Sequence, residues 1–331
     1  MNVGIFVDNY LPQRTGSAVV VLNLKQGLET LGHKPYIFTV ALPGYKERDP
    51  RIYRFPSLPA LIDPQQRFGF PSRAQIRRIV RRKGIEILHS HSEFSFGVMA
   101  RLLGWELNIP YVHTFHTLWE EYTHYLGVGK LFFTTERVRS MFRWFAKRMA
   151  LAIAPSMKTK RYLEGIDLGC EVVLVPNGIE IERFKGFTLR EEKRKELCKR
   201  YSILDTDRII LITGRVAKEK SIDRLIRFMP EILKQEKNAK LLIVGGGPDE
   251  DDMRSLAEKM GLGDRVIVTG FIDYSDMPAF YSLGEVFVTA SRTEMHPLVV
   301  IEAIACGLPV VVADDEAFKT MVKDGKNGFF C

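Results

Sequence analysis

Two glutamates lie eight positions apart in the segment TEMHPLVVIEAIACGLPVVVADD, at Glu294 and Glu302. The apolar run at 286–288 before them has the composition of a strand, and Pro297 suits the first turn of a helix, where its missing N–H costs no hydrogen bond. Glu294 is then expected on a loop at the carboxyl end of a strand, with Glu302 two turns along the helix. Carboxylates placed in this way can accept hydrogen bonds from sugar hydroxyls, while the helix N-terminus attracts a phosphate.

Two cations provide a second chemical signal. Arg215 and Lys220 follow an apolar run at 208–213 and lie five residues apart. Cations in such a loop would stabilise the departing β-phosphate of a nucleoside diphosphate, because charge develops there in the transition state. The alternative is a solvated surface loop. Glutamates at the interval seen above also occur by chance. Taken alone, the two cations favour the solvated loop, and only the neighbouring motifs described below favour the phosphate interpretation.

Glycines occur where predicted strands turn into helices. Gly245, Gly246 and Gly247 could let the backbone approach a nucleotide, and they describe a tight turn equally well. Gly16 follows the first predicted strand, where backbone amides could approach a phosphate or a sugar, although any such turn could use a glycine. The acidic run at 249–252 is interpreted as the first turn of a helix rather than as a metal site, because acidic side chains complement that end of the helix dipole.

Histidines and a glutamate lie near two predicted strand ends in the first half of the chain. His89, His91 and Glu93 resemble a zinc-ligand group, but no third histidine or thiol is close to them in the sequence. We therefore expect roles toward an acceptor substrate or in the structure. His113 and His116 end a further predicted strand. A lone histidine at a strand end is more often structural, and His113 keeps that interpretation.

Short β-branched runs alternate with amphipathic stretches of helical length, which indicates βα units wound on parallel sheets. The pattern occurs in two series, with candidate strands at 2–7, 34–40, 86–90, 110–115, 151–154 and 171–175, and then at 208–213, 239–244, 265–268, 285–289 and 309–313. We predict an α/β protein with two doubly wound domains, residues 1–178 and 179–331, with a linker in the charged stretch 180–200. Such sheets bind ligands at the carboxyl ends of their strands, and two domains facing one another would place these ends on both walls of one cleft.

Composition sets the outer limits of function. The 331 residues have enough apolar content for two cores. The four cysteines lack C-x-x-C spacing, so neither disulfides nor a zinc site are expected, and the cytoplasm fits best. The N-terminal MNVGIFV breaks at Asp8 without a basic region and is predicted as a strand rather than a signal peptide. The longest apolar run, 297–313, is interrupted by Glu302, Gly307 and Pro309, so no membrane span is predicted.

The formal charge of +8 indicates an anionic partner. Basic residues concentrate at 67–83, which contains Arg73, Arg77, Arg78, Arg81 and Arg82, and at 130–148. The second stretch also carries Phe132, Phe133 and Trp144, and it is the better candidate for membrane contact because cationic aromatic helices bind anionic lipid. Its apolar residues recur at helical spacing and equally describe a helix packed on a core. We find no motif for nucleic-acid recognition and expect no nucleic-acid partner.

Five segments occur in an order and spacing that resemble family 4 of the retaining glycosyltransferases, which have the GT-B fold. They are PNGI (176–179), GRVAKEKS (214–221), LLIVGGGPDED (241–251), VIVTGFID (266–273) and SRTEMHPLVVIEAIACGLPVVVAD (291–314). In the first half, three segments resemble the bacterial glucosyltransferases that use diacylglycerol as the acceptor. They are FVDNYLPQRTGSAVVV (6–21), HSHSEFSFG (89–97) and IPYVHTFHTLWEEYTHYL (109–126).

The resemblance implies transfer of a hexose, with glucose the expected sugar, from a UDP-sugar with retention of configuration and without an enzymatic nucleophile. Arg215 and Lys220 would stabilise the leaving phosphate, Glu294 would orient the hexose, and His116 would bond a sugar hydroxyl. The remaining donor contacts implied are Gly16, Gly245, Gly247, Leu298, Val299 and, at the ribose, Glu302. No metal or other cofactor is required, because cations and the helix dipole neutralise the phosphate, and Mg2+ would at most stimulate the reaction.

The acceptor implied is a lipid such as diacylglycerol, met at an anionic membrane surface on the inner face of the cell membrane. Asp8 and Glu93 would face this acceptor, although Asp8 equally suits a cap on its own loop. Two alternatives stay open. One is a family member that glycosylates a soluble acceptor. The other is a non-catalytic protein that binds sugar nucleotides, because the sequence ends at Cys331 where relatives continue through further helices.

Overall fold

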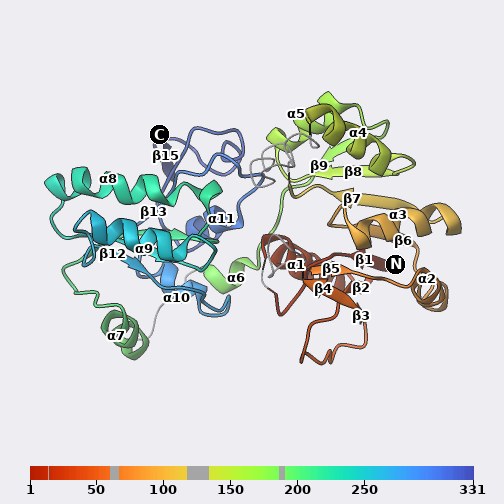
Figure 1. The fold of residues 1–331 in the computed structure, drawn as a ribbon, viewed down its shortest axis with the longest axis horizontal. Coiled ribbons are helices and arrows are strands. Elements are labelled where there is room, and N and C mark those ends of the chain that lie inside the picture. Colours follow the sequence, from red (N-terminus) through yellow and green to blue (C-terminus); the bar gives the residue numbers. More distant parts are fainter. Residues whose placement is uncertain (14, 60–66, 118–133, 186–190) are drawn as a thin grey trace. The chain divides into compact units, whose positions relative to one another are not determined.

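The computed structural model describes residues 1–13, 15–59, 67–117, 134–185 and 191–331. The chain forms two compact units, Met1–Gly178 and Ile179–Cys331, here termed unit 1 and unit 2. Each unit is an α/β layer structure with helices packed on a mainly parallel sheet (Figure 1).

Unit 1 contains a seven-stranded parallel sheet in the order β3-β2-β1-β6-β7-β8-β9. The strands are β1 Asn2–Phe6, β2 Lys34–Val40, β3 Ile52–Phe55, β6 Ile87–Ser90, β7 Tyr111–Thr114, β8 Leu151–Ala154 and β9 Val172–Leu174. The helices are α1 Gly16–Thr30, α2 Arg73–Arg82, α3 Ser95–Leu107, α4 Thr135–Ala146 and α5 Met157–Ile166. The strand order reverses between β1 and β6, and in doubly wound sheets this switch point is where ligands bind.

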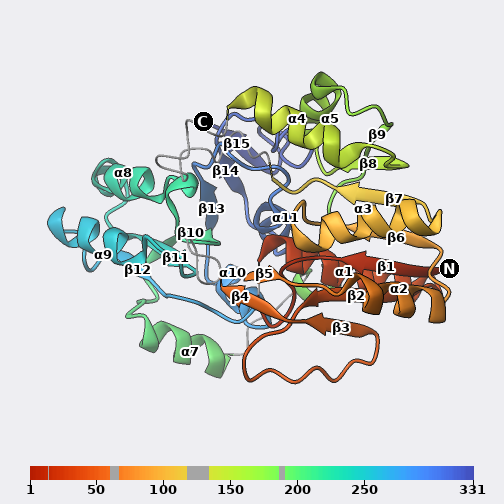
Figure 2. The same cartoon turned by 45° about the vertical axis from the view of Figure 1, so that its right-hand side comes forward.

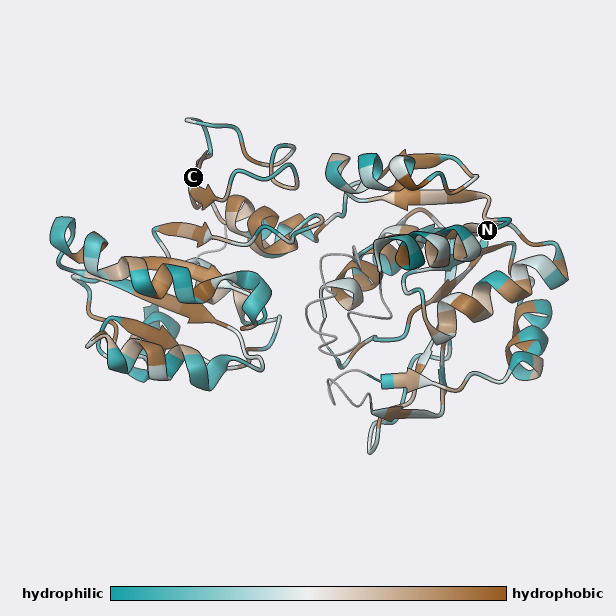
Figure 3. Ribbon diagram, turned by 45° about the horizontal axis from the view of Figure 1, so that its top comes forward, coloured by the Kyte–Doolittle hydropathy of each residue, from teal (hydrophilic) through white to brown (hydrophobic). Residues whose placement is uncertain are grey.

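Side chains along β1 alternate between two cores, because successive residues of a strand point to opposite faces. Phe6 packs with Phe38 and with residues of α2 to α5 on one face, while Ile5 packs with Val21 of α1 on the other. Figure 3 shows the result, with hydrophobic strands and helices that are hydrophobic on one side only. The sheet is therefore buried on both faces, and polar side chains concentrate at its ends.

Four strands lie outside the predicted set: β3, β4 Ser57–Pro59, β5 Arg67–Gly69 and β15 Gly328–Phe330. The predicted strands are all present, each within one residue at either end. β4 and β5 form a separate antiparallel pair. The missed strands are three or four residues long, and two of them contain an arginine, so they lack the apolar run that marks a buried parallel strand.

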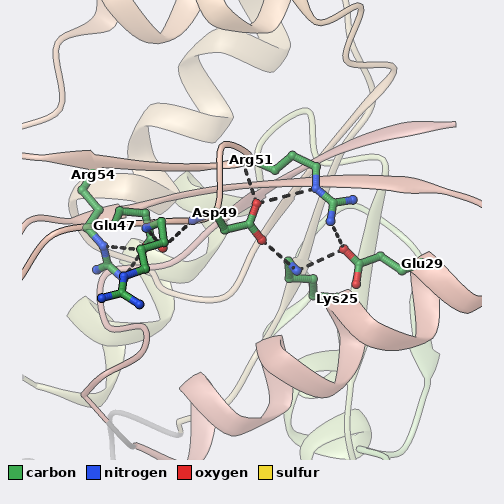
Figure 4. Close-up of polar contacts among 7 residues, drawn as sticks. Lys25, Glu29, Glu47, Asp49, Arg51 and Arg54 are labelled. Atoms are coloured by element: carbon green, nitrogen blue, oxygen red, sulfur yellow. Dashed lines mark hydrogen bonds and ion pairs between the residues drawn. The ribbon is translucent and has the colours of Figure 1, made fainter.

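An ion-pair cluster holds the loop between β2 and β3 against α1 (Figure 4). Lys25 Nζ lies 3.0 Å from Glu29 Oε1 and 3.1 Å from Asp49 Oδ2. Arg51 contacts the same Glu29 oxygen at 2.6 Å. These residues connect the last turns of α1 to the edge of the sheet, and so fix the helix that begins at Gly16.

Unit 2 contains a six-stranded parallel sheet in the order β12-β11-β10-β13-β14-β15 (Figure 2). Its strands are β10 Arg208–Thr213, β11 Ala239–Val244, β12 Val266–Val268, β13 Val286–Thr289, β14 Val310–Val312 and β15. Its helices are α6 Ile181–Phe184, α7 Glu191–Arg200, α8 Ile222–Gln235, α9 Glu250–Lys259, α10 Met277–Tyr281 and α11 Leu298–Ala305. Leu211 and Ile212, adjacent in β10, enter separate cores on the two faces.

The charged stretch 180–200, predicted as a linker, contains α6 and α7 and belongs to unit 2. Phe184 and Leu197 are buried in the core of that unit. The linker interpretation was therefore wrong for these helices, because a single buried apolar residue in each short helix is too weak a signal among so many charges.

The stretch at 130–148, predicted as a membrane candidate, contains α4. Phe142 and Phe145 lie in the core of unit 1, so the apolar stripe of α4 is a packing face. Phe132 and Phe133 lie outside the described residues. Within the described ranges, none of the helices combines the length and the apolar character needed to cross a bilayer.

Candidate functional site

In unit 2, the loops after β10 and β13 meet through two oppositely charged side chains. Lys220 Nζ lies 2.6 Å from Glu294 Oε1, and the two side chains are 26% and 11% exposed. The hydroxyls of Ser291 and Thr293 each donate to the carbonyl oxygen of Glu219 at 3.4 Å. Residues more than 70 positions apart in the sequence thus form one polar surface at the carboxyl edge of the sheet.

The pairing joins two residues that were predicted to contact different parts of the donor, Lys220 the leaving phosphate and Glu294 the hexose. A phosphate that approached Lys220 would share its ammonium group with Glu294, which already neutralises part of that charge. Arg215 lies on the same loop as Lys220. Its guanidinium opposes the rise in the pKa of Asp249, which is caused mainly by burial of that carboxyl.

The glycine turn after β11 packs backbone to backbone against the loop after β10. A Cβ atom on Gly245 would lie 1.9 Å from the carbonyl oxygen of Gly214, and one on Gly247 would lie 2.1 Å from that of Val216. Val216 N–H also donates to the carbonyl oxygen of Gly246 at 3.0 Å. Close packing inside the protein therefore already requires these glycines, and their contact with a nucleotide stays a prediction.

Glu302 lies on α11 and is 3% exposed. Tyr274 donates to its Oε1 at 2.9 Å and Tyr281 to its Oε2 at 2.8 Å. Burial raises the pKa of Glu302 in spite of these two hydrogen bonds, which act in the opposite direction. Sequence analysis missed both tyrosines, because no local pattern distinguishes a tyrosine that holds a carboxylate from one that fills a core.

The first turn of α11 begins beside these carboxylates. Pro297 stands at the N-cap position and makes no side-chain capping hydrogen bond. Leu298 and Val299 follow as the first two helical residues. Their amides lie at the positive end of the helix dipole, which suits an anionic group. The contact of these two residues with a donor is not tested by the structure and stays a prediction.

In unit 1, Asp8 lies just after β1 and is 4% exposed. It accepts hydrogen bonds from the Ser92 hydroxyl and, at 3.4 Å, from the N–H of Phe96 in the first turn of α3. Burial raises the pKa of Asp8 to about 6 against the opposing effect of these donors. This geometry is that of a helix cap across two loops rather than a cap on its own loop. The predicted contact with an acceptor stays a prediction.

Gly16 is the first residue of α1, and Thr15 caps the helix by accepting from the N–H of Ala18 at 3.2 Å. No atom lies within 4 Å of the position that a Cβ on Gly16 would take. Arg54 of β3 supports the preceding loop by donating to the carbonyl oxygen of Leu11. The backbone at Gly16 is thus held in place beside open space, as approach of a ligand would require.

Three histidines contact one another at the carboxyl ends of β6 and β7. His91 Nδ1 lies 2.9 Å from His116 Nε2, and the centroids of the His89 and His91 rings are 4.2 Å apart. Removal from solvent lowers the pKa of His89 and of His116 to about 3, and repulsion from His113 adds to both effects. Burial also lowers the pKa of His91 well below its usual range. These imidazoles are therefore neutral near pH 7.

Glu93 takes part in a separate buried network. Its Oε1 lies 3.4 Å from His113 Nε2, and His113 Nδ1 lies 2.6 Å from Ser90 Oγ. Ser90 Oγ in turn contacts the hydroxyl of Tyr111 at 2.9 Å. His113 thus has partners on both ring nitrogens, as expected of a structural histidine. The role of Glu93 toward an acceptor stays a prediction.

The two groups that resemble metal sites in the sequence have other partners. The acidic run at 249–252 falls at the N-cap and in the first turn of α9, where Glu250 pairs with Arg254 at 2.8 Å. His89 Nε2 bonds the Thr114 hydroxyl at 2.8 Å. Over the ranges that the structure describes, no three His, Cys, Asp or Glu side chains are arranged to hold a metal ion. That the protein needs no cofactor stays a prediction.

An exposed apolar surface lies near the carboxyl edge of the unit 1 sheet, the edge at which the histidines lie. Leu58, Phe68, Phe70 and Phe94 are between 39% and 60% exposed, and we term them the apolar hairpin surface. The Phe68 ring meets that of Phe94 edge to face at 5.9 Å. Phe94 precedes α3 directly, so this surface adjoins the loop that carries Glu93 and Ser92. The cationic helix α2 begins three residues after Phe70.

The sequence was compared with known families and proteins. Residues 14–183 match the family model described as Glycosyltransferase Family 4, and residues 193–331 match that described as Glycosyl transferases group 1. An alpha-monoglucosyldiacylglycerol synthase of Streptococcus pneumoniae is 31% identical over 98% of this chain and 74% of its own length. A protein of the same name from Acholeplasma laidlawii is 30% identical over 100% of this chain and 84% of its own.

Solved structures resemble the whole chain in fold. The Anabaena protein HepE, in complex with UDP and glucose, has a TM-score of 0.73 at 16% identity and covers 100% of this chain and 85% of its own. WaaG, a glycosyltransferase involved in lipopolysaccharide biosynthesis, has a TM-score of 0.71 at 16% identity, with the same shares covered.

Proposed function

Because the chain belongs to glycosyltransferase family 4 and has the GT-B fold, we propose that it transfers glucose from UDP-glucose to diacylglycerol, with retention of configuration, at a membrane surface. The observation that carries the donor part is the junction of Lys220 and Glu294 at the carboxyl edge of the unit 2 sheet. The names of the two synthases above support the lipid acceptor.

The loop after β10 supplies the cations for the leaving UDP. Lys220 is part-exposed, so its ammonium group is open to a phosphate while Glu294 holds it in place. Arg215, on the same loop, adds a second positive charge, and the first turn of α11 adds its dipole. These groups stabilise the β-phosphate as the bond to the sugar breaks. Metal ions are not required for this step.

The carboxylates and a neutral histidine orient the sugar. Glu294 accepts a hydrogen bond from a hydroxyl of the hexose, and Glu302 accepts from the ribose. His116 hydrogen-bonds another hexose hydroxyl through Nδ1, because its Nε2 contacts His91, and its low pKa keeps the ring neutral. No residue acts as a covalent nucleophile. The leaving phosphate takes the proton of the acceptor hydroxyl, so positioning and charge stabilisation supply the catalysis.

The lipid acceptor enters through unit 1. The apolar hairpin surface is suited to the acyl region of a bilayer, and the arginines of α2 are suited to anionic headgroups. Arg73 and Arg77 each contact Glu106 at 2.8 Å, and Arg78, Arg81 and Arg82 follow along the same helix. Since membranes of this charge face the cytoplasm, the inner face of the cell membrane is the proposed location.

The transfer is tested by UDP release from UDP-glucose with diacylglycerol in anionic mixed micelles. Acceptor-dependent release that persists in EDTA and is lost in Glu302→Ala is the expected result. Release with soluble sugars but not with diacylglycerol would overturn the lipid acceptor in favour of a soluble one. UDP binding without release in the presence of either acceptor would identify a non-catalytic nucleotide-binding protein.

The membrane contact is tested by sedimentation with vesicles of phosphatidylglycerol or phosphatidylcholine. We expect binding to phosphatidylglycerol alone, and a loss of binding when Phe68 and Phe70 are both changed to Ser. Phe271→Ser is the matched control, because Phe271 is 67% exposed in unit 2 and lies outside the apolar hairpin surface. Equal binding of all three proteins would contradict the assignment of this surface.

A further inference from the structure

The carboxylate of Glu302 is held by a hydrogen-bond network that reaches the loop of the cations. Tyr274 and Tyr281 occupy one carboxylate oxygen each, at 2.9 and 2.8 Å. The Tyr281 hydroxyl also lies 2.8 Å from the hydroxyl of Thr213. Thr213 is the last residue of β10, immediately before the loop of Arg215. One tyrosine thus links the predicted ribose ligand to the strand that presents the predicted phosphate ligands.

The Tyr281 hydroxyl has two acceptors within reach, the carboxylate of Glu302 at 2.8 Å and the carbonyl oxygen of Val299 at 3.2 Å. The carboxylate is the nearer and the charged acceptor, so it takes the proton. A phenol has one proton to donate, and burial raises the pKa of Tyr281 well above its usual range, so that proton is retained. If Tyr281 donates to Glu302, the hydroxyl of Thr213 must donate to Tyr281. Each oxygen of an ionised carboxylate has about two acceptor sites. One site on each oxygen of Glu302 is therefore filled by a tyrosine, and one remains on each.

We propose that Tyr281 and Tyr274 are positioning residues that hold the Glu302 carboxylate so that its two remaining acceptor sites receive the two hydroxyls of a ribose. This inference rests on the proposed function, because it assigns the ligand of Glu302 to the donor nucleotide. The tyrosines touch no substrate themselves. They fix the plane of the carboxylate and favour its ionised form, which burial alone would disfavour.

A purely structural role for Tyr281 makes a different prediction. Its ring is fully buried and lies 5.9 Å from that of Phe184 and 6.3 Å from that of Phe287. If only this packing mattered, Phe at position 281 would keep it. If the hydroxyl served only to stabilise the fold, its loss would weaken the binding of all nucleotides alike, whether or not they carry ribose hydroxyls.

The test is calorimetric titration of the full chain with UDP and with 2′,3′-dideoxy-UDP. The variants are Tyr281→Phe and the more exposed Tyr274→Phe, which covers the case in which Tyr281→Phe does not fold. Tyr201→Phe is the matched control. Tyr201 packs on the same core, 5.8 Å from Phe280, and its hydroxyl has no hydrogen-bond partner among the described residues.

We expect the wild type and Tyr201→Phe to prefer UDP over the dideoxy analogue. Each test variant should bind UDP about tenfold more weakly, because a hydrogen bond to a charged group is lost, and should bind the analogue as the wild type does. On acidification, the variants should also lose UDP at a higher pH, since the pKa of Glu302 rises further without its donor.

Three other outcomes would overturn the inference, and they are distinguishable. If the variants keep the wild-type preference for UDP, the tyrosines do not position Glu302, and the proposed transferase stands. If the variants lose affinity for both ligands equally, the role is structural. If the wild type binds no UDP, the proposed function fails, and this inference fails with it.

Discussion

The two units place polar side chains at the same edge of the same kind of sheet, but the chemistry of the two edges differs. In unit 1, His89, His91 and His116 are neutral and contact one another. In unit 2, Lys220 and Glu294 form an ion pair. A doubly wound sheet therefore fixes where a ligand binds, and the loop residues fix what the site can bind. This difference is what the proposed function requires, with the diphosphate bound by unit 2 and uncharged hydroxyls by unit 1.

Removal of the unit 2 cation should have the largest effect. Lys220→Met keeps the aliphatic stem and deletes the charge, and we expect kcat/KM for UDP-glucose to fall by about 100-fold or more. Stability should change by less than about 1 kcal/mol, because the ion pair is part-exposed. Steady-state kinetics and urea unfolding provide the two readouts. Lys234→Met, which removes an exposed pair with Glu231 on α8, is the control and should leave both unchanged. A similar loss in both variants would remove the special role of Lys220.

The next largest effect is expected on the free energy of unfolding, from a substitution in the closely packed glycine turn of unit 2. Gly247→Ala would place a Cβ 2.1 Å from the carbonyl oxygen of Val216, and such overpacking costs about 1–3 kcal/mol of unfolding free energy. Urea unfolding measures it, with Gly263→Ala as the control because a Cβ there would have no atom within 4 Å. Equal stability of the two variants would show that the turn can relax.

The neutral histidines of unit 1 predict loss of stability in acid. The pKa values of these histidines are lower in the folded chain than in the unfolded chain, so the unfolded chain binds more protons as the pH falls. Each of His89 and His116 therefore lowers the free energy of unfolding by about 1.4 kcal/mol for each pH unit of acidification between pH 6.5 and about 3. Asp8 acts oppositely, because its raised pKa stabilises the fold below about pH 6. On acidification from pH 7 to pH 5, the destabilisation by the two histidines exceeds the stabilisation by the one carboxyl, so the free energy of unfolding falls.

Tryptophan fluorescence during urea unfolding measures this effect, since residues 105, 119 and 144 are the three tryptophans and all precede Gly178. We expect a lower midpoint at pH 5 than at pH 7 and a smaller difference in His89→Gln. An equal or higher midpoint at pH 5 would contradict the neutral cluster.

The smallest change in stability is expected at Gly16. Gly16→Ala meets no atom within 4 Å, so the unfolding free energy should change by less than about 1 kcal/mol. If a donor approaches the backbone there, KM for UDP-glucose should still rise. An unchanged KM would leave Gly16 as an ordinary turn residue and would sharpen the contrast with Gly247.

Much of the fold follows from the sequence because buried parallel strands leave continuous apolar runs. The edge strand β3 was missed for the opposite reason, since Arg54 points from it toward the loop after β1. The helix α7 was missed because only Leu197 among its residues is buried. Elements with one buried residue depend on tertiary packing that local patterns do not record.

The site was predictable as a set of residue types but not as a set of contacts. Lys220 and Glu294 were each assigned a ligand, and their pairing depends on two loops that are distant in the sequence. The cap formed by Asp8 depends on a helix 88 positions later. The tyrosines at Glu302 carry no signal at all before the core is assembled.

The division between the two units is tested most directly by varying both substrates in one steady-state experiment, with diacylglycerol presented in phosphatidylglycerol vesicles. The variant with both Phe68 and Phe70 changed to Ser should show a raised KM for diacylglycerol and an unchanged KM for UDP-glucose. Lys220→Met should impair use of UDP-glucose and leave vesicle binding intact. If the variant at Phe68 and Phe70 changed KM for diacylglycerol and KM for UDP-glucose equally, or changed neither, the assignment of the lipid to unit 1 would be contradicted.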